Sequence, residues 1–212
     1  MDDLVHQVFS RQGGVSQGDF ASLNVGNNTR DSGDAVLENR RRIQNHLGVS
    51  RSFYVQQVHG REILVLKSRD LPLEKLQGFV THVHTADGII TDIKDLALMI
   101  QVADCQAVLF YDPVRQVIAN VHSGWRGSVQ NIIGHCVDVM KYEFGCSPAD
   151  ILVGISPSLG PCCAEFIHYK KELPKSFWPY KAADKDTFDF WGISQGQLQE
   201  KGISEKNIEV MG

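Results

Sequence analysis

Short, almost continuous apolar runs dominate the middle of this chain. Residues 96–102, 107–111 and 116–121 are each bounded by polar or turn-forming positions, a pattern typical of buried strands. Asp112 and Pro113 separate the last two runs and predict a turn between them. Further strands are predicted over residues 4–9, 53–58, 62–66, 86–91 (after a turn) and 151–155.

Apolar positions three and four residues apart predict three helices. In the first, residues 34–47, one apolar face is preceded by Asp31 or Ser32 as a cap and followed by Gly48 as a stop. Strands joined by both hairpins and helical crossovers indicate an α+β protein rather than a regular α/β winding. The other two helices are predicted after Ser128 as far as Gly145, with Val129, Ile132, Ile133, Cys136, Val137 and Met140 as the apolar stripe, and over 193–201.

The composition is that of an ordinary globular protein. A chain of 212 residues with 42% hydrophobic positions can bury a sizeable core, and we expect residues 1–212 to form one domain. A net charge of −4 without a long basic run argues against a nucleic-acid partner, and residues 40–42 are expected on a solvated helix face. The chain has no 18-residue apolar run and no signal peptide, so neither a membrane span nor secretion is expected.

The five cysteines have no framework spacing, which favours reduced thiols and a cytoplasmic location. Two of them, Cys162 and Cys163, are adjacent. They fit a vicinal redox pair, although two packing residues in a tight turn are the simpler interpretation. Nothing in the sequence indicates the oligomeric state.

Three residues stand in segments that are unusual for a structural core: His59, Cys105 and His122. Two imidazoles and one thiolate suit zinc, and three protein ligands leave a fourth position open, as in catalytic zinc sites. The three are too far apart in sequence for a zinc finger, but strand ends can bring them together. Taken singly, each has a simpler interpretation, because a histidine before glycine suits a turn and a cysteine on a strand packs as a small hydrophobe.

The neighbours of these residues suggest further chemistry. Asp104 could hydrogen-bond to a metal-binding side chain and fix the orientation of that side chain. Arg126 stands just before the predicted helix, where its guanidinium and the amides of Gly127 and Ser128 could bind phosphate. A surface arginine paired with a carboxylate explains Arg126 equally well.

Eight short motifs follow one another along the chain. Together they closely resemble the family named for multicopper polyphenol oxidase (laccase) domains, also called the purine nucleoside phosphorylase family, which includes the bacterial peptidoglycan editing factor. The resemblance implies a layered αββα-type sandwich with mixed sheets, similar to the catalytic domain of cytotoxic necrotizing factor toxins. The motifs are Arg11-x-Gly-Gly-Val-Ser16, Ser22-Leu-Asn24, Asn39-Arg40, Gln57-Val-His-Gly60, Ala86-Asp-Gly88, Ala103-Asp-Cys105, His122-x-Gly-Trp-Arg-Gly127 and Gly160-Pro-Cys-Cys163.

The resemblance also implies an activity, in which zinc is held by His59, Cys105 and His122. The expected reactions are phosphorolysis of adenosine, inosine and methylthioadenosine, and deamination of adenosine, with a purine nucleoside and phosphate as partners. Asp104 or Glu165 is expected to move the proton in deamination. Expected phosphate or substrate ligands are Arg11, Asn24, Arg40, Arg126, Gly127 and Ser128.

Three other functions come into consideration. One is a cysteine hydrolase with Cys105 as nucleophile and His122 as base, for which the editing of peptidoglycan precursors is a candidate role. Another is copper-dependent polyphenol oxidation, which we reject because its copper centres need roughly ten histidines. The chain has eight histidines in all. The third is a non-catalytic metal-binding scaffold.

The sequence departs from the family pattern at a few positions. Ala107 stands where a proline is usual, and Asn120 and Ser123 replace small apolar residues near His122. The family's C-terminal strand has no counterpart before Gly212. If the protein itself lacks that segment, an edge strand and an arginine near the site are in doubt.

Overall fold

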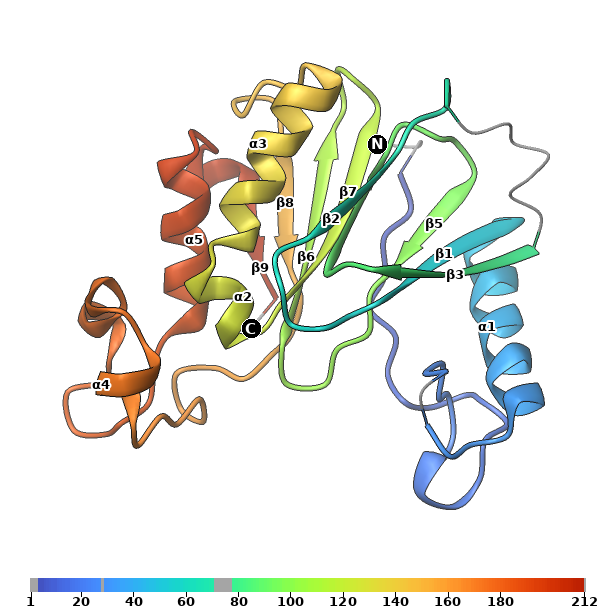
Figure 1. Cartoon of the computed structure of the whole chain (residues 1–212), viewed down its shortest axis with the longest axis horizontal. Helices are drawn as coiled ribbons and strands as arrows, with labels where there is room; N and C mark the ends of the chain where they lie inside the picture. The colour runs from blue at the N-terminus through green and yellow to red at the C-terminus, as the bar shows by residue number, and fades with distance from the viewer. Residues whose placement is uncertain (1–3, 28, 71–77, 212) are drawn as a thin grey trace.

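Two β-sheets packed face to face form the centre of the protein, with helices on both outer sides (Figure 1). The computed structural model describes residues 4–27, 29–70 and 78–211, with the backbone alone for 78–83. Helices α3 (Ile132–Phe144) and α5 (Phe190–Glu200) cover the larger sheet, and α1 (Gly33–Leu47) lies beyond the smaller one. The predicted α+β class and layered sandwich are confirmed. None of the described helices combines the length and apolarity that crossing a bilayer demands.

The larger sheet has six strands in the order β2-β4-β7-β6-β8-β9. Its central pairs are antiparallel, whereas β2–β4 and β8–β9 at the two edges are parallel, so the sheet is mixed. The Asp112 carboxylate accepts the amides of Val114 and Arg115 in the predicted turn between β6 and β7. The strands are β2 (Ile63–Leu66), β4 (Gly88–Thr91), β6 (Gln106–Asp112), β7 (Val117–Ser123), β8 (Leu152–Ile155) and β9 (Ile208–Val210).

The smaller sheet has three parallel strands in the order β3-β1-β5. They are β3 (Gly78–Thr85), β1 (Arg51–Gln56) and β5 (Leu96–Met99). Helix α1 docks on this sheet, where Gln44 donates to the Ser52 hydroxyl across the buried contact. The core between the two sheets consists of Phe53, Leu66, Ile89, Ile93, Leu96 and Leu98.

The long helix predicted after Ser128 is two helices. Helix α2 (Trp125–Val129) ends before Asn131, whose backbone is left-handed with φ of 53°. The Asn131 side chain then caps α3 by accepting the Gly134 amide at 2.9 Å. Because of this break Val129 leaves the apolar stripe and is 37% exposed, while the rest of the predicted stripe is buried in the core. The remaining short helices are η1 (Gly18–Phe20), α4 (Tyr169–Glu172), η3 (Lys175–Tyr180) and η4 (Glu205–Asn207).

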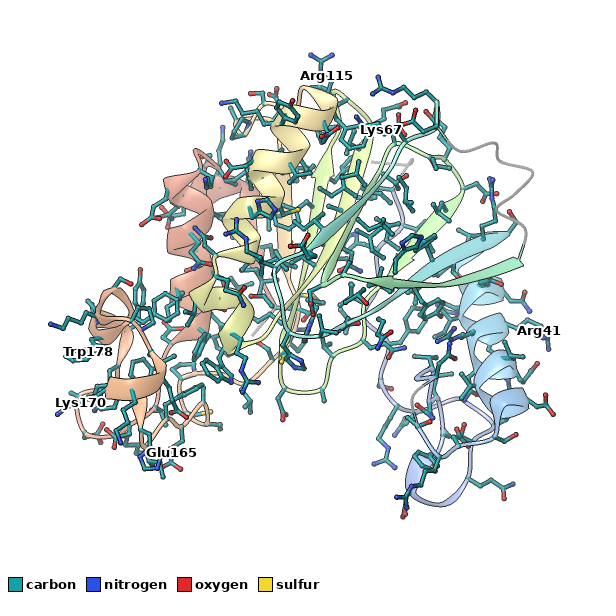
Figure 2. All side chains as sticks on the ribbon, viewed as in Figure 1. Arg41, Lys67, Arg115, Glu165, Lys170 and Trp178 are labelled. Carbon is teal, nitrogen blue, oxygen red and sulfur yellow. The ribbon has the colours of Figure 1, made fainter. Side chains whose placement is uncertain are left out.

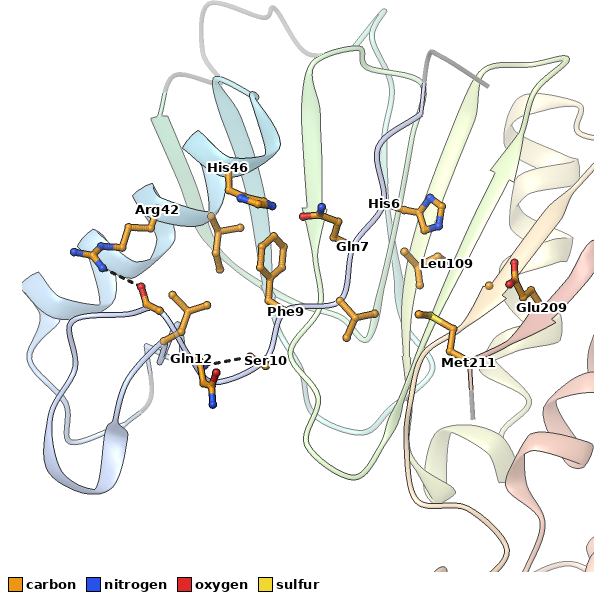
Figure 3. Close-up of a pocket in the computed structure, with 15 residues that line it drawn as sticks. His6, Gln7, Phe9, Ser10, Gln12, Arg42, His46, Leu109, Glu209 and Met211 are labelled. Carbon is orange, nitrogen blue, oxygen red and sulfur yellow. Dashed lines mark hydrogen bonds between the residues drawn. The ribbon is translucent and has the colours of Figure 1, made fainter.

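The chain ends were predicted less well. Residues 4–9 have the composition of a strand but pair with no strand in the described part of the chain. Residues 6–9 line an open hollow of about 830 Å³, in which the Phe9 ring lies 5.7 Å from the His46 ring of α1 and Leu109 and Met211 lie on the other side (Figure 3). The edge strand β9 was not predicted, because three residues are too few for a periodic signal.

One hydrogen-bond network joins the first three motifs, residues 11–16, 22–24 and 39–40, against α1. Asn39 is fully buried, and its amide oxygen accepts the Val15 amide at 2.8 Å. Its amide nitrogen donates to the Ser16 hydroxyl and to the carbonyls of Ser22 and Asn24. These residues therefore fix the loop over 11–31 against the helix.

Candidate metal centre

The three predicted ligands meet where separate segments converge. His122 lies near the end of β7, opposite Ala107 of β6, while Cys105 immediately precedes β6 and His59 follows β1. Their ligand atoms all lie within 4.8 Å of one another. His122 is buried, Cys105 is half-buried and His59 is exposed, so the group opens to solvent on the His59 side.

A buried carboxylate, that of Asp87 immediately before β4, holds both histidines. It accepts the backbone amides of Val58, His59 and Gly60, with His59 at 2.9 Å and Gly60 at 2.7 Å. Its Oδ1 also lies 2.8 Å from His122 Nδ1, which leaves Nε2 as the nitrogen available to a metal. A carboxylate behind a metal-binding histidine fixes the ring orientation and raises its basicity.

The role of Asp87 was not predicted from the sequence. Asp104 was predicted instead because it is adjacent to Cys105, whereas Asp87 reaches the site through the pairing of β4 with β7. The motif over 86–88 was the available signal. Asp104 is exposed, and its backbone carbonyl accepts the Leu159 amide at 3.0 Å. The orienting function predicted for Asp104 is therefore performed by Asp87.

The electrostatics of the buried pair are strongly perturbed. Burial alone lowers the pKa of His122, but hydrogen bonds and charge at Asp87 and Cys105 outweigh it and raise the pKa to about 9. Burial raises the pKa of Asp87, yet the hydrogen bonds from His122 and three backbone amides lower it overall. The metal-free protein therefore holds a charged His122 beside the Asp87 carboxylate, and a bound cation would replace a proton on the imidazole.

The backbone around the ligands is shaped for close approach. His59 has a left-handed backbone with φ of 59°, which is uncommon for a residue with a side chain and recurs at functional sites. A Cβ atom added at Gly124 would lie 2.8 Å from Cys105 Sγ and 3.3 Å from His59 Cδ2. Glycine is therefore needed where the chain passes the ligand group between β7 and α2.

The residues present fit a metal ion. Imidazole and thiolate are the ligands that zinc prefers, and tetrahedral ligands at its usual bond lengths lie roughly 3.5 Å apart. The three ligand atoms lie within 4.8 Å of one another, so small side-chain rotations would bring all three to one ion. His122 can bind through Nε2 while Asp87 retains Nδ1.

Arg126 lies inside α2 rather than before a helix. It is exposed, and its guanidinium carbon stacks 4.7 Å from the centre of the Trp125 ring. Gly127 and Ser128 are buried, and the Ser128 amide donates to the Gly124 carbonyl at 2.9 Å. Of the three residues predicted to bind phosphate here, Arg126 alone presents its side chain to solvent.

The other predicted phosphate ligands make hydrogen bonds within the protein. Arg11 donates twice to the Ala21 carbonyl, and the Asn24 side chain bonds within its own loop to Thr29 and Asp31. Arg40 is 2% exposed, donates twice to the Val25 carbonyl and lies 3.8 Å from the centre of the Tyr54 ring. Burial lowers the pKa of Arg40. These contacts of Arg40 hold the loop that carries Val25. They give no reason to expect a direct contact between Arg40 and phosphate.

The fold and this site define an α+β protein with an open His-Cys-His centre. A family model described as multi-copper polyphenol oxidoreductase laccase matches residues 5–212. The chain therefore belongs to this laccase-named family, as the motifs predicted.

Relatives with curated names agree on one activity. The chain is 36% identical over 156 residues to purine nucleoside phosphorylase YlmD of Geobacillus stearothermophilus, covering 73% of this chain and 57% of that protein. It is 30% identical over 217 residues to human purine nucleoside phosphorylase LACC1, covering 98% of this chain and 48% of that protein. The chain thus spans about half the length of these relatives.

Solved structures show the same architecture. The hypothetical protein YfiH of Bacillus licheniformis superposes with a TM-score of 0.81 at 29% identity, over 95% of this chain and 79% of that one. YlmD of Geobacillus stearothermophilus gives 0.79 at 30% identity, over 94% and 77%.

Gly124→Ala should weaken metal binding, because the new Cβ would displace Cys105 Sγ from the ligand group. We expect at least about a tenfold rise in the dissociation constant for zinc, measured with a competing chelator. Gly33→Ala is the matched control, since no atom lies within 4 Å of its added Cβ. Equal affinities in the two variants would contradict the proposed crowding.

The metal-free protein should lose stability as the pH rises. The folded pKa of His122, about 9, exceeds the ordinary value of 6.5, so its contribution is complete below pH 6.5 and disappears through pH 9. This contribution amounts to up to about 3 kcal/mol. Asp87→Asn removes the main partner and should flatten the decline, as measured by urea unfolding with chelator present. A decline of the same size in the variant would refute the role of Asp87.

Proposed function

We propose that this protein is a zinc-dependent purine nucleoside phosphorylase that acts on adenosine, inosine and methylthioadenosine and also deaminates adenosine. The observation that carries the proposal is the meeting of His59, Cys105 and His122, with ligand atoms within 4.8 Å and one side open to solvent. The names of the curated relatives support phosphorolysis. A purine nucleoside and phosphate are the proposed substrates.

Zinc is favoured over copper by the donor set. Zinc accepts two imidazoles and a thiolate and leaves a fourth position for the reaction, where it would supply Lewis-acid polarisation of an oxygen atom. Multicopper oxidation, named in the family description, needs several copper sites. Within the described residues, His59, Cys105 and His122 form one such group and no second group of three metal-binding side chains occurs.

The surroundings of the metal group suit a nucleoside. Val58, adjacent to His59, is 49% exposed, and Leu159, held to the Asp104 carbonyl, is 40% exposed. Exposed aliphatic side chains beside a polar group can contact the flat purine base and exclude water from it. We assign Val58 and Leu159 this contact.

Arg126 is the proposed phosphate ligand. In phosphorolysis a phosphate oxygen attacks C1′ of the ribose, the glycosidic C–N bond breaks, and the purine leaves with the electron pair and takes up a proton. Stacking on Trp125 limits the freedom of the Arg126 guanidinium, which can hold phosphate through two N–H groups. In the described part of the chain no carboxylate pairs with Arg126, so this charge is available.

In deamination, water takes the place of phosphate as the attacking group and ammonia leaves C6 of the purine. A nearby carboxylate must accept the proton of the water and pass it to the departing nitrogen. Asp104 is exposed and adjacent to Cys105, and we propose it for this step. Glu165 is less favoured, because it lies on the α4 side of the protein (Figure 2).

One observation favours a second candidate function, a cysteine hydrolase. Ligand atoms of His122 and Cys105 lie within 4.8 Å of each other, so the imidazole is near enough to act as a general base toward the thiol. A thiolate held by zinc is a poor free nucleophile, so the two functions require opposite metal states. Peptidoglycan precursor editing would use the metal-free form.

Cys105→Ala should remove both zinc and turnover. The purified protein should hold about one zinc per chain and release hypoxanthine from inosine only with phosphate present. Elemental analysis and chromatography of the reaction products measure these quantities, with Cys162→Ser as an exposed-cysteine control. A variant with full zinc and full turnover would exclude the site, and turnover restricted to the chelated enzyme would favour the hydrolase.

Arg126→Ala should impair phosphorolysis more than deamination, since deamination needs no phosphate. A charge-assisted hydrogen bond of about 1.5–3 kcal/mol corresponds to a loss of roughly ten- to a hundredfold in kcat/KM for phosphate. Arg41→Ala on α1 is the matched control, because this exposed arginine pairs with Glu38 far from the metal group (Figure 2). Equal losses in both reactions would assign Arg126 to a contact with the nucleoside instead.

A further inference from the structure

A layer of five buried polar side chains lies between the larger sheet and the helices α2 and α5. Two of them each follow a metal ligand in sequence and face each other across the β6–β7 pair, one lies on α2, and two lie on α5. The layer is therefore next to the metal group, on the opposite face of the sheet from the His122 side chain. In chain order its members are Gln106, Ser123, Ser128, Ser194 and Gln197.

Hydrogen bonds connect the two α5 side chains to the sheet and to α2. The Ser194 hydroxyl donates to the Gln106 amide oxygen at 2.6 Å. The Gln197 amide nitrogen donates to the Ser128 carbonyl at 2.7 Å, and the hydroxyls of Ser128 and Ser123 lie 3.1 Å apart. Because a carbonyl oxygen only accepts, the atom of Gln197 that contacts it must be the amide nitrogen. Gln197 thus ties α2 to α5 through one directed bond.

This polar layer is not explained by stability. The Gln106 amide nitrogen and the Gln197 amide oxygen are buried and have no hydrogen-bond partner among the residues that the structure describes. A buried polar atom without a partner destabilises the folded state, and an apolar side chain of the same length would avoid that cost. A glutamine at position 197 is therefore better explained by what its amide nitrogen holds in place.

The helix that Gln197 holds carries groups close to the metal ligands. Gly124, immediately before α2, lies against Cys105, and Arg126 within α2 is the proposed phosphate ligand. A helix of five residues has little stability of its own, so its orientation depends on its neighbours. Helix α2 contacts α3, α5 and β7 (Figure 1).

We propose that Gln197 is a positioning residue for phosphate, because its bond to the Ser128 carbonyl sets the orientation of α2 and thereby the place of the Arg126 guanidinium beside the metal group. This inference rests on the proposed phosphorolysis. Ser128 follows Arg126 by two residues in the same short helix, so a tilt of α2 moves the base of the Arg126 side chain. Stacking on Trp125 restrains the guanidinium, whereas Gln197 restrains the helix that carries both residues.

Gln197→Met in the zinc-loaded protein tests the inference, because methionine has a similar length and volume but cannot donate to the Ser128 carbonyl. The KM and the dissociation constant for phosphate should both rise about three- to tenfold, part of the effect of losing Arg126 itself. Adenosine deamination and kcat at saturating phosphate should stay within about twofold of the wild type. Zinc content should be unchanged, and the melting temperature should be equal or higher. Calorimetric titration with phosphate and steady-state kinetics measure these quantities.

Two further variants separate positioning from general destabilisation. Leu198→Ala is the matched control on α5, because this side chain is fully buried in the core. It should lower the melting temperature without weakening phosphate binding. In a double-mutant cycle, Gln197→Met should have no further effect on kcat/KM for phosphate once Arg126→Ala is present, because residues that act through one another are not additive.

Unchanged phosphate affinity in Gln197→Met would overturn the inference. So would an equal loss with and without the Arg126 side chain, or a loss of zinc and of melting temperature in place of the change in phosphate affinity. A wild type that binds phosphate but releases no purine would instead refute the proposed function, and the phosphate dissociation constants would still test Gln197. A wild type that binds no phosphate would refute both.

Discussion

The charge of Asp87 is the constraint on which the site depends. A carboxylate with no exposed surface is costly to bury unless every lone pair finds a donor, and here three backbone amides and one imidazole supply them. Those donors come from the loop after β1 and from β7, which belong to different sheets. One buried anion thus fixes the relative position of the two sheets and of the two histidines.

Glycine determines how closely the segments approach around that anion. The backbone at Gly124 passes so near Cys105 and His59 that no larger residue fits, and Gly60 lies directly against Asp87. The left-handed backbone of His59 is maintained because the Asp87 carboxylate holds its amide and those on either side. The ordered backbone therefore keeps the ligands close together before any ion binds.

The sequence predicted most of the central strands, since runs such as 107–111 carry a strong apolar signal. It also predicted α1 and its stop at Gly48, which has φ of 68°. The break at Asn131 was missed because a side-chain cap can end one helix and begin another without interrupting the apolar periodicity. Residues 4–9 were wrongly predicted as a strand, because apolar composition does not supply a pairing partner.

The site was predicted unevenly for a similar reason. His59, Cys105 and His122 could be named from residue chemistry and from the motifs, and the fold then brought them together. Asp87 could not be assigned, since its role depends on the register of β4 against β7, in which Gly88 faces Val121. Arg40 was predicted to lie on a solvated helix face but is buried, which only the packing of α1 reveals.

The strand connections carry a consequence for how the protein folds. The pairs β1–β3, β1–β5, β2–β4 and β8–β9 are parallel, so each must be closed by a long excursion of the chain. A long loop must be closed at an entropic cost before the strand contacts that it allows can stabilise the fold, and this slows folding. Proteins with such topologies typically fold in about milliseconds to seconds. The hairpin of β6 and β7 is local and can form early, while His59 arrives only with the parallel pairs. During synthesis Cys105 therefore spends an interval as an unprotected thiol, when oxidation or capture by a wrong metal competes with completion of the fold.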